Sequence, residues 1–128
     1  MAQVVVVEDD GDIATLVAHK LRSDGHDVVV EHDGQAGLAA VRQLRPSLVV
    51  LDWMMPRMSG LEVCQAIRDD PELAGTRVLM LTAKAQEADL ERAFAVGADE
   101  FLLKPFSPRE LVLRANALLA RVGGPGTA

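Results

Sequence analysis

Five short apolar runs alternate along the chain with longer segments whose apolar residues recur every three to four positions. The runs are nearly continuous in valine and leucine. This is typical of strands that helices cover on both faces of a parallel sheet. We predict strands at residues 3–7, 27–31, 48–51, 77–81 and 101–103.

The segments between these runs predict helices. The first covers about residues 13–23, with Asp10 or Asp12 available as the N-cap. The second begins after Asp33, and the third follows Ser59 and stops before Pro71, as helices tend to do near proline.

Two more helices are predicted in the C-terminal half. The fourth has apolar residues at i, i+3, i+4 and i+7, namely Leu90, Ala93, Phe94 and Gly97. The fifth begins with the capping-box pattern Ser107-Pro108-Arg109-Glu110 and extends to about residue 121.

Five successive strand-helix units indicate a parallel sheet between two layers of helices. Right-handed crossovers leave few topologies. A flavodoxin-like three-layer α/β sandwich with strand order 2-1-3-4-5 is the commonest for five strands. We expect one domain over residues 1–121, followed by a flexible tail or linker at residues 122–128, which contain Gly-Gly-Pro-Gly.

Composition narrows the class of protein. The 128 residues are 49% hydrophobic, enough for one domain with its own core, and the single cysteine excludes an internal disulfide. No apolar run is long enough to cross a membrane and no signal peptide is evident, so we expect a cytoplasmic protein. The formal net charge of -6 argues against direct nucleic-acid binding by this chain and favours a small cation as ligand.

Polar residues follow four of the five predicted strands. Glu8-Asp9-Asp10 comes after the first, Asp52 after the third, Thr82 after the fourth and Lys104 after the fifth. Strands one and three are neighbours in the expected order, so Glu8, Asp9 and Asp52 should converge, and such carboxylates require a neutralising cation. Mg²⁺ meets that need, and a hydroxyl and an ammonium beside it suit a phosphoryl group with an aspartate as nucleophile.

The motifs resemble those of the receiver domains of two-component response regulators. They are Val6-Val7-Glu8-Asp9-Asp10, Leu51-Asp52-Trp53-Met54-Met55-Pro56 with Ser59-Gly60, Leu81-Thr82-Ala83, and Gly97-Ala98-Asp99-Glu100-Phe101 running into Lys104-Pro105-Phe106. The resemblance spans about residues 3–121, and all motifs occur in order at the expected strand ends.

This resemblance implies a phosphoryl acceptor that depends on Mg²⁺. Asp52 would take a phosphoryl group from a sensor histidine kinase or a phosphotransfer protein. Asp9 and Asp52 would bind Mg²⁺ directly, Glu8 through water, and Met54 through its backbone carbonyl. Lys104 would pair with the phosphoryl oxygens, and the family usually has a cis peptide bond after this lysine. Such a domain promotes only its own phosphorylation and slow dephosphorylation, so we do not expect an enzyme acting on other substrates.

The resemblance also implies a switch. Thr82 would move its hydroxyl to the phosphoryl group, and Phe101 would turn inward, although Phe101 also fits a plain core position. The fourth helix, fifth strand and fifth helix would present the changed face. Met54 and Lys84 stand where the family tunes attack by water, and their bulk predicts a long-lived phosphorylated state.

The output stays open between two possibilities. The chain is either a single-domain regulator that docks onto a downstream protein, or the receiver of a longer winged-helix DNA-binding regulator. Glu100, Glu110 and Arg114 match the charge-pairing positions of a phosphorylation-dependent homodimer in the winged-helix branch, but Leu90 replaces its usual basic residue.

Two other classes use similar sheets. A Mg²⁺-dependent aspartyl phosphatase usually has a second aspartate two residues after the nucleophile, where this chain has Met54. A flavin-binding module needs a phosphate-binding loop after the first strand, and that loop is missing.

Overall fold

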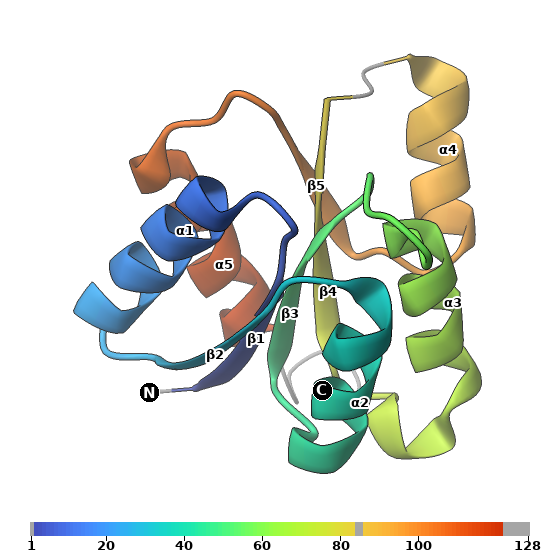
Figure 1. Ribbon diagram of the computed structural model, residues 1–128, viewed down its shortest axis with the longest axis horizontal. Helices are drawn as coiled ribbons and strands as arrows, with labels where there is room; N and C mark the ends of the chain where they lie inside the picture. Colours follow the sequence, from blue (N-terminus) through green and yellow to red (C-terminus); the bar gives the residue numbers. More distant parts are fainter. Residues whose placement is uncertain (1, 84–85, 122–128) are drawn as a thin grey trace.

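The computed structural model describes residues 2–83 and 86–121. One parallel sheet has the strand order β2-β1-β3-β4-β5, so the predicted flavodoxin-like topology is confirmed (Figure 1). Its strands are β1 (Gln3–Val7), β2 (Asp27–Glu31), β3 (Leu48–Asp52), β4 (Arg77–Thr82) and β5 (Glu100–Leu103). The predicted tail at residues 122–128 and Lys84 lie outside the described residues.

Helices cover both faces of the sheet. Figure 1 shows α1 (Gly11–Ser23) and α5 (Pro108–Ala120) on one side, and α2 (Gly34–Leu44), α3 (Gly60–Asp69) and α4 (Glu87–Ala95) on the other. A short 3-10 helix, Pro71–Leu73, follows α3. None of the helices in the described ranges is long and apolar enough to cross a bilayer.

The sheet separates two hydrophobic cores because successive side chains of a strand point to opposite faces. In β1, Val5 and Val7 pack into the core under α2 and α3, while Val4 and Val6 pack into the core under α1 and α5. All four valines are fully buried. This explains why the strands are continuous apolar runs in the sequence.

β3 and β4 extend one residue further than predicted. Asp52 pairs with Leu81 and Thr82 pairs with Leu103 in the parallel ladder. The prediction ended each strand at its last apolar residue, whereas strand pairing uses the backbone and does not require an apolar side chain. Asp52 and Thr82 therefore stand on the sheet itself, which holds them more rigidly than a loop would.

The start of the first helix differs from the prediction, and the predicted start of the third helix is confirmed. Asp10 is the cap of α1, because its Oδ1 accepts hydrogen bonds from the backbone N–H groups of Asp12 and Ile13, so the helix begins two residues earlier than predicted. A capping box with both hydrogen bonds is found at α3, between Ser59 and Glu62, where only a helix start is predicted. Asp10 lies shortly after the end of β1, and Ser59 follows the loop that leads from β3 into α3.

The predicted apolar face of the fourth helix is wrong in part. Ala93 is buried, but Phe94 is 46% exposed, and the helix ends before Gly97, whose φ is +102°. α4 packs beside β5, the edge strand, so less of the sheet is available to cover its apolar side chains. Phe94 instead meets Phe101 edge to face, with ring centroids 5.4 Å apart.

Candidate functional site

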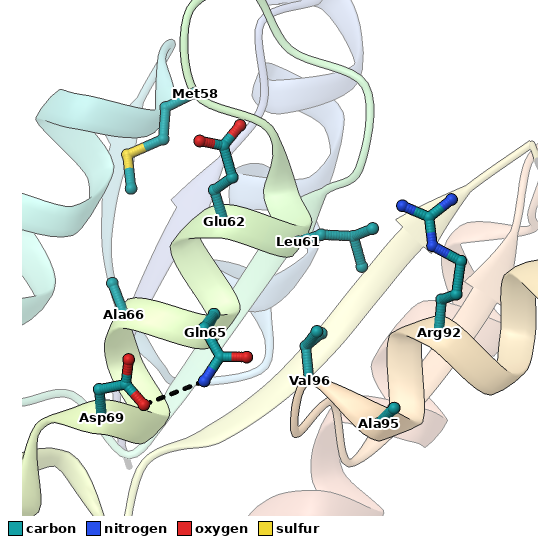
Figure 2. A pocket seen from close by; sticks show the side chains of 9 residues that line it. All are labelled: Met58, Leu61, Glu62, Gln65, Ala66, Asp69, Arg92, Ala95 and Val96. Carbon is teal, nitrogen blue, oxygen red and sulfur yellow. Dashed lines mark hydrogen bonds between the residues drawn. The ribbon is translucent and has the colours of Figure 1, made fainter.

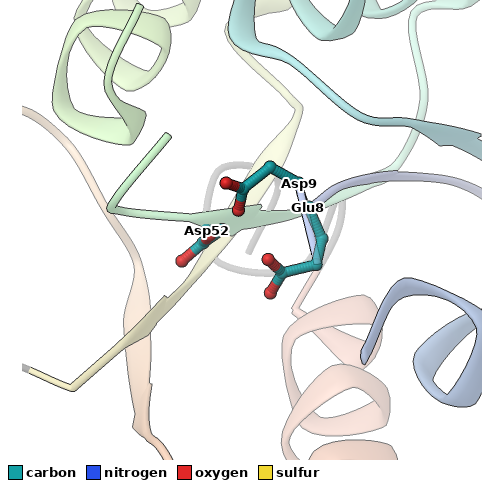
Figure 3. Close-up of side chains that lie close together, drawn as sticks. All are labelled: Glu8, Asp9 and Asp52. Atoms are coloured by element: carbon teal, nitrogen blue, oxygen red, sulfur yellow. The ribbon is translucent and has the colours of Figure 1, made fainter. Parts of the chain in front are cut away.

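Three carboxylates meet at the carboxyl edge of the sheet, as predicted. Glu8 and Asp9 follow β1, and Asp52 ends the neighbouring β3. One carboxylate oxygen from each lies within 4.8 Å of the other two. Figure 3 shows the three side chains gathered around one small space. Their convergence follows from strand order, because adjacent parallel strands end at the same edge.

The burial of the three carboxylates is unequal. Glu8 is fully buried and Asp52 is 2% exposed, whereas Asp9 is exposed to solvent. The cluster therefore has a closed inner side and an open outer side. An ion or a phosphoryl donor can approach from the side of Asp9.

Lys104 supplies a cation to the cluster. Its Nζ donates to Glu8 Oε1 at 2.9 Å and to Asp52 Oδ1 at 3.1 Å. The lysine leaves β5 beside Thr82, whose backbone carbonyl accepts the Lys104 N–H at 2.8 Å, and a cis peptide bond joins Lys104 to Pro105. Thr82 is 1% exposed at the end of β4. The fourth and fifth strands thus contribute to the same edge as the first and third.

The electrostatics of the cluster are unbalanced. The pKa of Asp52 is raised from 3.8 to about 7, chiefly by burial and also by the hydrogen bond and charge of Glu8, while the hydrogen bond from Lys104 opposes the rise. Burial alone would lower the pKa of Lys104, but its hydrogen bonds to Glu8 and Asp52 outweigh burial and raise it. The Lys104 ammonium contacts two of the three carboxylates, and its single positive charge is outnumbered by the acidic groups of the cluster. The site therefore favours a further positive charge.

The donor set fits Mg²⁺. Three carboxylates offer hard oxygen ligands, and the exposure of Asp9 leaves room for the waters that Mg²⁺ retains. Met54 follows in the β3–α3 loop with its side chain 60% exposed, and the ligand role of its carbonyl stays a prediction.

Phe101 and the predicted dimer residues lie away from the carboxylates, whereas Thr82, the other predicted switch residue, stands at the same edge of the sheet as the carboxylates. Phe101 is half-buried in β5 against Phe94. Arg114 pairs with Glu100 at 3.3 Å and with Glu110 at 3.5 Å, so the three predicted dimer residues form one charge cluster on the β5–α5 surface. Their roles in switching and dimerisation stay predictions.

Sequence reasoning missed two supports of the site. The N–H of Gly60 donates to the carbonyl of Trp53 at 2.9 Å, directly after Asp52, and the Trp53 ring is 4% exposed beneath the guanidinium of Arg92. The Ser-Gly pair signals only a helix start in the sequence. No sequence signal indicates the close approach of α3 to the end of β3.

The structure leaves no room for a side chain at Gly60, which gives a testable prediction. A Cβ at this position would collide with the carbonyl oxygen of Asp52 and come within 2.8 Å of Trp53 Cα. We expect Gly60→Ala to lower the free energy of unfolding by about 2–3 kcal/mol in urea titrations followed by circular dichroism.

Gly11 provides a matched control, since it also begins a helix but a Cβ added there would meet nothing within 4 Å. Gly11→Ala should leave stability unchanged or raise it by about 0.5 kcal/mol, because alanine restricts the unfolded chain. Equal effects of the two substitutions would show that the contact at Gly60 is unimportant.

Comparison with known proteins places these features in a family. The sequence profile of the response regulator receiver domain matches residues 4–116. The chain is 44% identical to the DNA-binding response regulator MtrA of Mycobacterium tuberculosis (strain ATCC 25618 / H37Rv), over 93% of this chain and 51% of that protein. It is 40% identical to the alkaline phosphatase synthesis transcriptional regulatory protein PhoP of Bacillus subtilis, over 93% of this chain and 49% of that one. The chain spans about half the length of these curated relatives.

Solved structures show the same fold. The chemotaxis response regulator CheY4 of Vibrio cholerae aligns with a TM-score of 0.88 at 33% identity, covering 92% of this chain and 98% of that one. A BeF3-activated DrrB receiver domain aligns with a TM-score of 0.86 at 32% identity, covering 94% of this chain and 99% of that one.

Proposed function

Because the chain belongs to the family of response regulator receiver domains, we propose that its signalling state is a phosphoryl group carried on Asp52. It is the receiver domain of a two-component response regulator. The observation that supports Asp52 as the acceptor is the meeting of Glu8, Asp9 and Asp52 with Lys104 at one edge of the sheet.

The proposed step is a phosphoryl transfer from the phosphohistidine of a sensor histidine kinase or phosphotransfer protein. A carboxylate oxygen of Asp52 forms the new O–P bond while the P–N bond of the donor histidine breaks and its electron pair returns to the imidazole. Lys104, already within hydrogen-bond distance of Asp52, would hold a phosphoryl oxygen, and Thr82 would donate its hydroxyl to another. We place this exchange in the cytoplasm.

Mg²⁺ is the proposed cofactor, bound by Asp9 and Asp52, by Glu8 through water and by the carbonyl of Met54. When bound, it neutralises charge on the phosphoryl group during transfer. The carboxylate cluster supports this assignment, since it holds more negative charge than Lys104 alone offsets.

Intact-mass measurement with acetyl phosphate and Mg²⁺ tests the acceptor. We expect one added phosphoryl group per chain, lost in Asp52→Asn because an amide cannot form the acyl phosphate. Asp27→Asn, at an exposed carboxylate on β2, should still be phosphorylated. An adduct that persists in Asp52→Asn would contradict the assignment. Multiple turnovers of p-nitrophenyl phosphate would instead indicate a phosphatase.

We further propose that the phosphorylated chain acts as the receiver half of a longer DNA-binding regulator and pairs with a second copy through β5 and α5. Leu113 is 62% exposed beside the cluster of Glu100, Glu110 and Arg114, so an apolar contact and charge pairs are offered on one surface. The relatives that the chain half covers are named as DNA-binding or transcriptional regulators. A single-domain regulator docking on a downstream protein is the alternative.

Solution mass with and without beryllofluoride distinguishes these outputs. We expect a monomer without the mimic and a dimer with it, and Leu113→Asp should keep the chain monomeric because the apolar contact is lost. Asp52 phosphorylation should be unaffected by this substitution. A monomer under both conditions would favour docking onto a different protein.

A further inference from the structure

A groove on the opposite side of the molecule from α5 is lined by none of the residues that form the carboxylate and lysine cluster. It lies between α3 and α4 and has a volume of about 570 Å³. Figure 2 shows it from close by. Its apolar side chains come from the β3–α3 loop, from α3 and from the C-terminal end of α4 with its cap, namely Met58, Leu61, Ala66, Ala95 and Val96.

The α3 edge of the groove is acidic. Glu62, Gln65 and Asp69 are exposed and stand at i, i+3 and i+7, so they follow one another along a single face of the helix. Glu62 accepts from the backbone of Ser59, and Asp69 from the Gln65 amide at 2.9 Å. Among the described residues, neither carboxylate forms an ion pair.

The α4 edge carries the opposite charge. Arg92 is exposed, forms no ion pair within the described ranges, and holds its guanidinium 6.0 Å from the centroid of the Trp53 ring. The groove thus has an apolar centre, an acidic wall and a basic wall. A molecule that binds here must present a basic group to the acidic wall, an apolar surface to the centre and an acidic group to the basic wall.

The distance between the carboxylates of Glu62 and Asp69 indicates how large a molecule can bind both of them. Glu62 and Asp69 are seven residues apart, which is ~10 Å along a helix axis. A small ammonium ligand reaches one carboxylate but not both, whereas a helix lying along α3 presents side chains at the same two-turn interval. Helices that bind in grooves use such an apolar stripe flanked by charged residues.

We propose that this groove binds an amphipathic helix of a protein partner, with basic side chains against Glu62 and Asp69, apolar side chains in the centre and an acidic side chain toward Arg92. Charge complementarity indicates which side chains the partner must carry. The interval between the two carboxylates indicates that these side chains are presented by a helix. The proposal does not depend on phosphoryl transfer at Asp52.

The probe for this proposal is a synthetic helical peptide of about 15 residues, with leucines on one face, two lysines seven positions apart on one flank and a glutamate on the other. We expect it to bind the full chain with a Kd of about 10–100 μM, to shift amide resonances of α3 and α4, and to change Trp53 fluorescence as Arg92 turns to the glutamate. A peptide with lysine and glutamate exchanged should bind at least about tenfold more weakly.

Matched variants test the acidic wall. Glu62→Gln/Asp69→Asn keeps shape and the α3 hydrogen bonds and should weaken binding about five- to tenfold. Asp27→Asn/Glu91→Gln removes two exposed carboxylates outside the groove and should change binding by less than about twofold.

Equal losses in both double variants, or equal binding of the exchanged peptide, would overturn the proposal in favour of nonspecific charge attraction. Absence of binding at about 1 mM peptide would also overturn it. A mass that rises with protein concentration, with shifts in the same groove, would assign the groove to a second copy and overturn the partner helix.

Discussion

Replacing Lys104 by methionine is expected to lower the free energy of unfolding by about 3 kcal/mol near pH 8 without divalent cations. Glu8 is fully buried and Asp52 nearly so, and Lys104 is within hydrogen-bond distance of both. Methionine keeps most of the stem but leaves two buried carboxylates uncompensated. The raised pKa of Lys104 keeps the ammonium charged near pH 8, so its stabilisation is fully present there.

Three measurements separate this cause from a general loss of packing. Lys20→Met, at an exposed lysine of α1, should change stability by less than about 0.5 kcal/mol. Lys104→Met/Asp52→Asn should recover much of the loss, since one carboxylate is removed as well. Millimolar Mg²⁺ should narrow the gap between Lys104→Met and wild type. If neither the added Asp52→Asn substitution nor Mg²⁺ restores the stability of Lys104→Met, the loss comes from packing and not from charge.

Asp52→Asn is expected to raise the free energy of unfolding by about 1–2 kcal/mol near pH 8, although it removes the proposed phosphoryl acceptor. The pKa of Asp52 is about 7 in the folded chain and 3.8 for an ordinary aspartate. Folding is therefore accompanied by proton uptake at Asp52 when the pH lies between about 4 and 7. Stability from this residue is therefore present below about pH 4 and falls as pH rises to about 7. Asparagine is never charged and avoids that loss.

Urea titrations near pH 5 and pH 8, with EDTA, check the sign. The advantage of Asp52→Asn should be small near pH 5, where folded Asp52 is already protonated, and larger near pH 8. Mg²⁺ should stabilise the wild type more than Asp52→Asn. A larger advantage near pH 5, or destabilisation near pH 8, would show that desolvation does not govern this carboxylate.

The fold was predictable because its signals are local and repeated. Runs such as 3–7 are typical of strands buried on both faces, and capping residues mark the helix starts after them. The errors arose where neighbours decide the outcome. Phe94 has helical spacing, yet it is exposed because α4 lies beside the edge strand and little of the sheet is left to cover it.

For the site, the sequence allowed us to predict which side chains come together. Strand order alone brings Glu8, Asp9 and Asp52 to one edge, and the structure places them there. Their differences were not predictable. Glu8 is buried and Asp9 exposed although they are adjacent acidic residues of the same segment, and no local pattern in the sequence distinguishes them.

Element order, the polar residues at the strand ends and hence the family can be inferred from the chain without its fold, because they depend on residue type and spacing. Three features depend on packing instead: Lys104 bridges Glu8 and Asp52, Gly60 must lack a side chain beside Asp52, and Arg92 faces an acidic wall across a groove. Each of these joins residues from different elements of the chain. Their distances arise from how helices pack on the sheet, which no local pattern encodes.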